Sequence, residues 1–229
     1  MVKTVALIKR LPQLERRAFR EHYEQRHVPL ALGLLEGLER YVRYHVEAEL
    51  HGEVDFDVIS AFGYRDREAV DSLLERLGGE AGSEIRADEL RFMDKPANRF
   101  FPVSERLLLA GEEGGEHGFV LVGRPESMSR FECSKILVRD HWPRLEKVLD
   151  APGFALLRDA FPFADRPAPW DALLQVRAGS LRRLEGWARS LEREGYRVCG
   201  VRTRRFETSL GGARRGGDSP GRCPSTGDL

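Results

Sequence analysis

The sequence predicts an α+β fold built from two tandem β-α-β-β-α-β repeats, and three observations lead to it. The chain has 229 residues, enough for one large domain or two small ones. Its apolar residues alternate along the chain between the two-residue period of strands and the 3.6-residue period of helices. One order of elements also occurs twice, because His27-Val28-Pro29 returns 114 residues later as His141-Trp142-Pro143.

The first repeat opens with a strand over residues 4–9, which Pro12 ends. A helix follows and stops near Gly37, which suits a helix end. Its apolar residues follow one another at intervals of four, four, three and four positions, which places them on one face of a helix. The stripe consists of Phe19, Tyr23, His27, Leu30 and Leu34.

The remainder of the repeat reads as strand, strand, helix, strand. Residues 40–46 and 56–64 are expected as strands, and residues 67–77 as a helix stopped by Gly78-Gly79. The last strand is expected at residues 99–103 or, in a longer form, 99–109. The polar stretch 83–95 is expected to be a connecting segment between the helix and that strand.

The second repeat follows the same order without a gap. Strands are expected at 117–123, 154–160, 171–176 and 197–206, and helices at 128–149 and 180–194. Chance matching of amphipathic segments is the alternative, but the shared register of two motifs favours duplication. Each repeat fits the ferredoxin-like signature, and packing the two sheets together buries the face of each that its helices leave open.

Composition breaks divide the chain. Residues 111–116 combine glycine with glutamate and read as a linker between a domain at 1–110 and a second repeat at 117–210. Residues 211–229 are too poor in apolar side chains to order themselves and read as a disordered tail.

Charge and composition exclude several classes of function. Lys and Arg total 37 and so do Asp and Glu, so no strong field attracts nucleic acid. No apolar stretch approaches the ~20 residues of a membrane span. Cys133, Cys199 and Cys223 are widely spaced and odd in number, which suggests a reducing, cytoplasmic setting. The glycine-rich nucleotide motifs and the His-Glu-x-x-His zinc motif are absent, so neither a cofactor nor a metal is expected.

The residues around the first His-x-Pro resemble the EthD family of the dimeric α/β-barrel superfamily. The resemblance rests on Arg26-His27-Val28-Pro29-Leu30-Ala31, the preceding Tyr23, and the following 35–41, Leu-Glu-Gly-Leu-Glu-Arg-Tyr. Phe56-Asp57 and residues 100–105 sit where that family has its third and fourth strands. The likeness covers about the first 105 residues; the second half, with Arg144 in place of Leu30, resembles the family only through the repeat.

The resemblance implies a ferredoxin-like half-barrel that is usually completed by a second subunit and here by the second repeat. EthD-like proteins include accessory proteins of ether degradation, cofactor-free monooxygenases that convert polyketide anthrones into quinones, and dehydratases of fungal pigment pathways. The resemblance therefore narrows the fold more than the reaction.

His27 is the main catalytic candidate, because an imidazole exchanges protons near neutrality and this one lies on the apolar stripe of a helix. A core histidine bonded to the backbone is the competing interpretation. Tyr23, one turn earlier, is placed to hydrogen-bond a phenolic or enolate oxygen, or to pack in the core. His141 repeats His27 as a third catalytic candidate, beside Trp142 as a substrate-binding one.

Tyr41, Arg43 and His45 share one face of a strand and are candidates for substrate binding, with plain solvent exposure as the alternative. Asp57 and Asp171 each open a strand and are candidates for His-Asp dyads, or for ordinary strand-start solvation. His22 and His27 are five residues apart, which puts them on different sides of an α-helix and makes them poor metal partners.

These features favour a cofactor-independent enzyme that acts on a hydrophobic aromatic or polyketide-like small molecule, with His27 as base or acid. Oxidation of a phenol or anthrone is preferred over dehydration or cyclisation. A non-catalytic binding or accessory protein is the alternative from another class. Whether the doubled chain pairs further as a homodimer is left open.

Overall fold

The computed structural model describes residues 1–113, 116–149, 153–162, 168–177, 181–208 and 210. The expected tail, 211–229, lies outside the described residues. The expected linker 111–116 is described only in part, and Glu116 already belongs to a strand.

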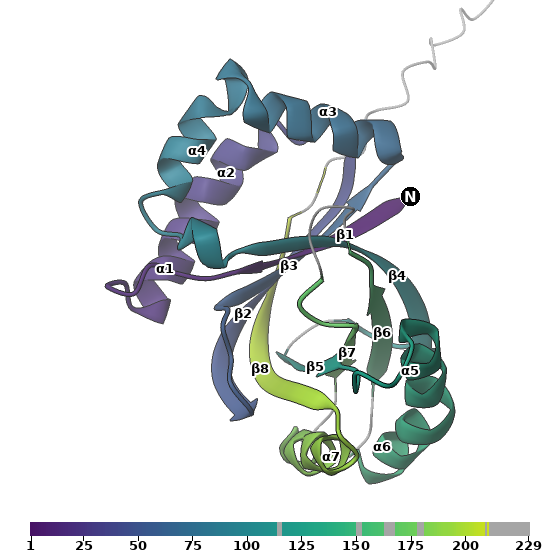
Figure 1. Ribbon diagram of the computed structural model, residues 1–229. Coiled ribbons are helices and arrows are strands. Elements are labelled where there is room, and N and C mark those ends of the chain that lie inside the picture. Colours follow the sequence, from purple (N-terminus) through teal and green to yellow (C-terminus); the bar gives the residue numbers. More distant parts are fainter. Residues whose placement is uncertain (114–115, 150–152, 163–167, 178–180, 209, 211–229) are drawn as a thin grey trace, which may run out of the picture.

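Eight antiparallel strands close into a barrel (Figure 1). Each expected strand is present, most within a few residues of its expected ends. The longest, β2, exceeds its expected range at both ends. The strands are β1 (Val2–Ile8), β2 (Leu38–His51), β3 (Val58–Tyr64), β4 (Arg99–Leu109), β5 (Glu116–Gly123), β6 (Phe154–Ala160), β7 (Ala172–Arg177) and β8 (Arg197–Thr208).

The two halves of the chain contribute four strands each and join along their edges. The barrel order is β1-β3-β2-β8-β5-β7-β6-β4, so β2 pairs with β8 and β4 pairs with β6 across the halves. The open face of each four-stranded sheet therefore turns inward. Its side chains, among them Leu7, Tyr44, Phe119 and Leu173, fill the barrel interior. The α+β class and the barrel are confirmed.

Helices cover the outside of the barrel on two sides. The first-half helices gather over one side and the second-half helices over the other (Figure 1). The helices of the first half are α1 (Arg16–His22), α2 (Val28–Leu32), α3 (Arg67–Gly78) and α4 (Ser83–Glu89), and those of the second half are α5 (Arg130–Ile136), α6 (Trp142–Val148) and α7 (Arg182–Arg193). Among the described helices, none is long and apolar enough to cross a membrane.

A π-helical turn interrupts the first helix of each half. The turn η1 (Tyr23–His27) separates α1 from α2, and η4 (Leu137–His141) separates α5 from α6, 114 residues later. Each turn lies just before a proline that has no N–H to donate, so the hydrogen-bond register changes there. In η1 the N–H of Val28 bonds to the carbonyl of Tyr23, five residues back.

The π turn shifts the buried face of the helix by one residue. Phe19, Tyr23 and His27 are buried as expected, but Val28 and Ala31 follow them inward. Leu30 and Leu34, the expected continuation of the stripe, are only half-buried. A uniform 3.6-residue period is therefore wrong beyond His27.

Asp57 ties the start of the first helix to the sheet. Its carboxylate accepts from the backbone N–H of Arg10 at 3.0 Å, from Arg10 Nε at 3.1 Å and from Arg16 Nε at 3.1 Å. Asp171 does the same in the second half with Arg124 and Arg130. Neither aspartate bonds a histidine, so the hypothesis of His-Asp dyads at these two positions is wrong.

Candidate functional site

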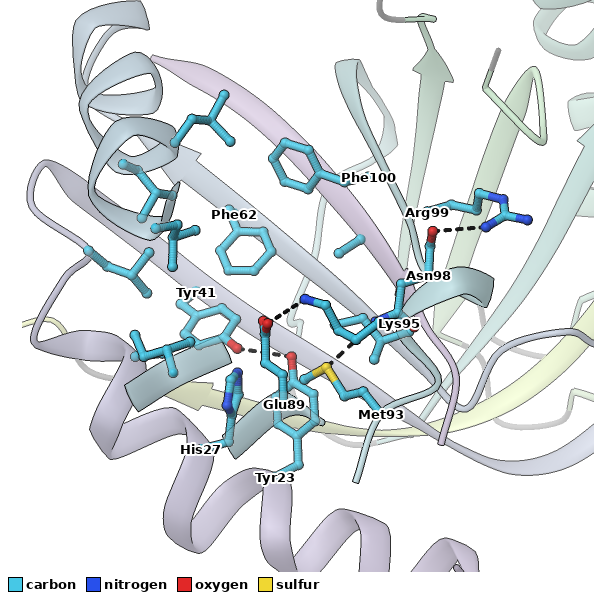
Figure 2. A pocket seen from close by; sticks show the side chains of 18 of the residues that line it. Tyr23, His27, Tyr41, Phe62, Glu89, Met93, Lys95, Asn98, Arg99 and Phe100 are labelled. Carbon is cyan, nitrogen blue, oxygen red and sulfur yellow. Dashed lines mark hydrogen bonds and ion pairs between the residues drawn. The ribbon is translucent and has the colours of Figure 1, made fainter. Parts of the chain in front are cut away.

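A cavity of about 370 Å³ separates the first-half helices from the outer face of the sheet. Its floor is formed by β1 to β4, its walls by α2, α3 and η1, and one end by α4 and the chain that follows it (Figure 2). Most of the lining is apolar or aromatic, as in sites for small organic ligands. The lining includes Ile8, Ala31, Leu73, Ile85, Phe62 and Phe100.

His27 lies in the wall of this cavity, which is the placement expected for a functional histidine. Its Nδ1 lies 3.1 Å from Oδ2 of Asp88, a residue of α4 that is itself 4% exposed. An ionised carboxylate only accepts, so His27 carries its proton on Nδ1 and leaves Nε2 as an acceptor. Among the described residues, none hydrogen-bonds Nε2. Burial lowers the pKa of His27, opposed by the hydrogen bond to Asp88, so the ring is neutral at neutral pH.

Tyr23 and Tyr41 place two hydroxyl groups in the same cavity. Their oxygens are 3.1 Å apart, and the Tyr23 hydroxyl also lies 3.0 Å from Oγ of Ser60. Burial raises the pKa of Tyr23 to about 12 and that of Tyr41 well above its ordinary value. Both phenols therefore stay protonated, and while one hydroxyl donates to the other, the second can donate to an oxygen of a bound ligand. Tyr23 also contacts His27 edge-on, with ring centroids 5.3 Å apart.

The charged residues of the cavity gather at one end. Glu89 and Lys95 form an ion pair across that end, and Asn98 and Arg99 lie beside it (Figure 2). Arg99 donates to the carbonyls of Pro96 and Asn98 at 2.7 and 2.9 Å.

Arg43 and His45 do not line the cavity, although Tyr41, two residues before Arg43 on β2, does. Both bond Glu24 of η1, Arg43 through Nη2 at 2.5 Å and His45 through Nε2 at 2.7 Å. The hydrogen bonds and charges of Arg43 and His45 lower the pKa of Glu24, although burial opposes this. The cluster fastens η1 to β2, and neither substrate binding nor solvent exposure describes these two residues.

The second half has no comparable cavity in the described residues. The corresponding space holds only about 10 Å³, and Trp142 and Trp187 fill it. Leu137 stands where the first half has Tyr23, and Trp187 where it has Leu73. His141 is buried, and its Nε2 lies 3.5 Å from Oε2 of Glu194. Within the described residues, the space beside Trp142 is therefore too small for a ligand.

Asp88 and Glu89 are the site residues that sequence reasoning missed, because 83–95 reads as polar. Helix α4 occupies residues 83–89. Ile85, Asp88, Phe92 and Met93 are all buried. Their spacing of three, four and one residues continues one helical face across the end of α4, and an aspartate within that apolar stripe was the available signal.

His22 and His27 both contact one side chain, that of Asp88. His22 Nε2 is 2.9 Å from Oδ1 of the same Asp88 carboxylate. The prediction that they point to different sides is wrong, because the π turn brings the fifth residue onto the side of the first. Within the described residues, no group of three His, Cys, Asp or Glu side chains is arranged to hold a metal ion.

Comparisons with solved structures find a similar fold in other proteins. An anthrone oxidase-like protein matches over 90% of this chain and 93% of its own, with a TM-score of 0.59 and 10% identity. A mutant chlorite dismutase from Candidatus Nitrospira defluvii, in complex with cyanide, matches over 90% of each chain with a TM-score of 0.51 and 11% identity. At such identities the likeness concerns the fold alone.

The first half of the sequence matches a family model. Residues 11–96 match the model of the EthD domain, and the matched stretch contains His27, Asp88 and both cavity tyrosines. No curated protein matches the chain.

Proposed function

We propose that the protein is an enzyme that removes a proton from a hydrophobic aromatic or polyketide-like small molecule in the first-half cavity. The observation that carries the proposal is Nε2 of His27, which has no hydrogen-bond partner among the described residues and lies in a mostly apolar cavity, while Nδ1 is held by Asp88. A neutral, oriented imidazole of this kind is a general base.

The lining matches such a ligand. The aromatic wall of Phe62 and Phe100 accepts a flat ring, and the hydrogen-bonded pair of Tyr23 and Tyr41 supplies one O–H donor for a carbonyl or enolate oxygen. Hydrogen bonds to an enolate stabilise the negative charge that deprotonation creates. Exclusion of water from the cavity strengthens those hydrogen bonds.

The reaction that we propose is cofactor-independent oxidation of an anthrone-type substrate. His27 Nε2 takes a proton from the activated CH₂ carbon, and the resulting carbanion gives two electrons to O₂ to form a hydroperoxide. Loss of water from the hydroperoxide leaves a carbonyl, so one CH₂ and one O₂ become one C=O and one H₂O. The structural likeness to an anthrone oxidase-like protein is in keeping with this proposal.

Only the first half is proposed to be catalytic. We further propose that the two halves arose by duplication, since their π turns and arginine–aspartate clamps recur at one constant offset. The second half then serves to close the barrel, while Trp142 and Trp187 occupy its former cavity.

The test is turnover of anthrone in air by the purified protein without added flavin or metal, followed by mass spectrometry and oxygen uptake. We expect His27→Ala to lose at least 100-fold in rate, consistent with the loss of a general base. His141→Ala is the matched control and should keep its rate, with circular dichroism confirming both folds. Equal rates for wild type and His27→Ala would contradict the proposal.

Two other functions are separated by the same assay. A dehydratase or cyclase would release water from its substrate without consuming oxygen. A binding or accessory protein would hold the aromatic ligand without converting it, and His27→Ala would then change affinity alone.

A further inference from the structure

The Asp88 carboxylate is shared by two imidazoles that come from one helix. His22 Nε2 reaches Oδ1 at 2.9 Å, and His27 Nδ1 reaches Oδ2 at 3.1 Å. Among the described residues, no other group hydrogen-bonds or pairs with this carboxylate. His22 therefore supplies half of the contacts that orient Asp88.

The backbone is built to bring the two rings to one carboxylate. Five residues of an α-helix turn through about 500°, which would leave His22 and His27 about 140° apart. The π turn η1, with its hydrogen bond from Val28 N–H back to Tyr23 O, widens the helix between them. The imidazole of His22 is further fixed by stacking on Phe92, with ring centroids 4.3 Å apart.

The two histidines differ in what else they meet. His27 lines the cavity, whereas His22 does not, and the His22 side chain is 19% exposed. His22 thus reaches the cavity wall through Asp88 and through Phe92, whose ring centroid lies 5.1 Å from that of His27. The second half, whose cavity is closed, has Ile136 at the position of His22.

We propose that His22 is a positioning residue: by donating to Oδ1 of Asp88, it holds Oδ2 against His27 Nδ1 and so keeps His27 in the tautomer whose Nε2 faces the cavity. The inference rests on the proposed function for its catalytic consequence, but the tautomer itself is measurable without any substrate. If the Asp88 carboxylate were free to turn away, His27 would also populate the form with its proton on Nε2, which cannot accept one from a ligand.

Two variants whose side chains carry the same amide group but differ in length provide the test. His22→Gln places an amide N–H near the former Nε2 and can still donate to Asp88, whereas the amide of His22→Asn is too short to do so. Both lose the ring and its stacking on Phe92, so any general effect on folding is common to the two. Thermal unfolding of both variants checks this.

The readout is the tautomer of His27 from long-range ¹H–¹⁵N spectra of ¹⁵N-histidine-labelled full-length protein. We expect a single Nδ1–H form in wild type and in His22→Gln, and a mixture in His22→Asn, with the His141 signals unchanged in all three. A single Nδ1–H form in His22→Asn would overturn the inference.

If anthrone turnover is found, kcat should fall about 10–100-fold in His22→Asn, the range typical of outer-shell partners, and recover to within a few-fold in His22→Gln. KM should change little, because His22 does not touch the ligand. Equal kcat values for the two variants would contradict the role of His22. Absence of turnover in wild type would count against the proposed function and leave the tautomer result standing.

Discussion

Acidification should destabilise this protein through His117, a buried histidine of β5 that is held in its neutral form. Its Nε2 donates to the carbonyl of Glu113 at 2.8 Å, and its Nδ1 lies 2.9 Å from the amide nitrogen of Gln175. Arg158 donates to Oε1 of Gln175 at 2.6 Å, which fixes the amide so that its N–H₂ group faces His117. A proton on Nδ1 would therefore point at the N–H₂ donor of Gln175, and the hydrogen bond between the two groups would be lost.

The pKa of His117 gives the size of the effect. Burial lowers it to about 4, from an ordinary value of 6.5. Below pH 6.5 the unfolded chain binds a proton at this residue and the folded chain does not, so stability falls with falling pH. At about 1.4 kcal/mol per pKa unit, the loss approaches about 3 kcal/mol near pH 4. Burial also lowers the pKa values of His27, His45 and His141, so wild type loses more than this in total.

The assay compares denaturant unfolding of wild type and His117→Gln at several pH values from 7 to 4. The variant cannot titrate at this position, so its stability should fall by about 3 kcal/mol less over this range than that of wild type. Its stability at pH 7 will also be lower, because the carbonyl of Glu113 and the amide of Gln175 lose their partner; only the pH dependence is diagnostic. Equal acid-induced losses in the two proteins would refute the reasoning.

The paired architecture yields two further predictions. Asp57→Ala and Asp171→Ala should each lower the free energy of unfolding, measured in urea, by about 2–3 kcal/mol. This is less than the ~3–5 kcal/mol of a fully buried ion pair, because the arginines that bind these aspartates reach solvent. A loss of stability in only one of the two variants would show that the two arginine–aspartate clamps are not equivalent. Leu73→Trp places in the first-half cavity the tryptophan that the second half has as Trp187. It should weaken the binding of 2-naphthol, measured by calorimetry, at least tenfold, with little change in thermal stability. An unchanged affinity would show that the ligand binds elsewhere.

The order of elements was predictable because apolar periodicity and the repeated His-x-Pro register determine it. Most of the observed strand ranges agree closely with the expected ones. Two such sheets bury their open faces by packing them against each other. Which edges pair was not predictable, since β2 pairs with β8 through residues that have no distinctive pattern.

The site was only partly predictable. The apolar stripe placed Tyr23 and His27 against the sheet correctly, because burial of a helix face is a local property. The π turn was not foreseen, and it moved Leu30 out and joined His22 to Asp88. Asp88 itself comes from a helix 61 residues away from His27, in a stretch whose polar composition hid its buried face.

Charged residues were the least predictable part. Alternation along β2 could not distinguish a ligand-binding face from one that pairs with a neighbouring helix. The distinction depends on Glu24, whose carboxylate binds both Arg43 and His45. In the same way, the identity of Trp142 indicated an aromatic ligand contact, whereas in the fold it fills space.

The most direct test of the account is to titrate ¹⁵N-histidine-labelled protein with 2-naphthol, a flat phenol that needs no turnover. The account predicts a saturable shift at Nε2 of His27, none at His141, and loss of saturation in Leu73→Trp. Saturable binding with no change at His27, or with the shift at His141, would contradict the assignment of the first-half cavity as the ligand site.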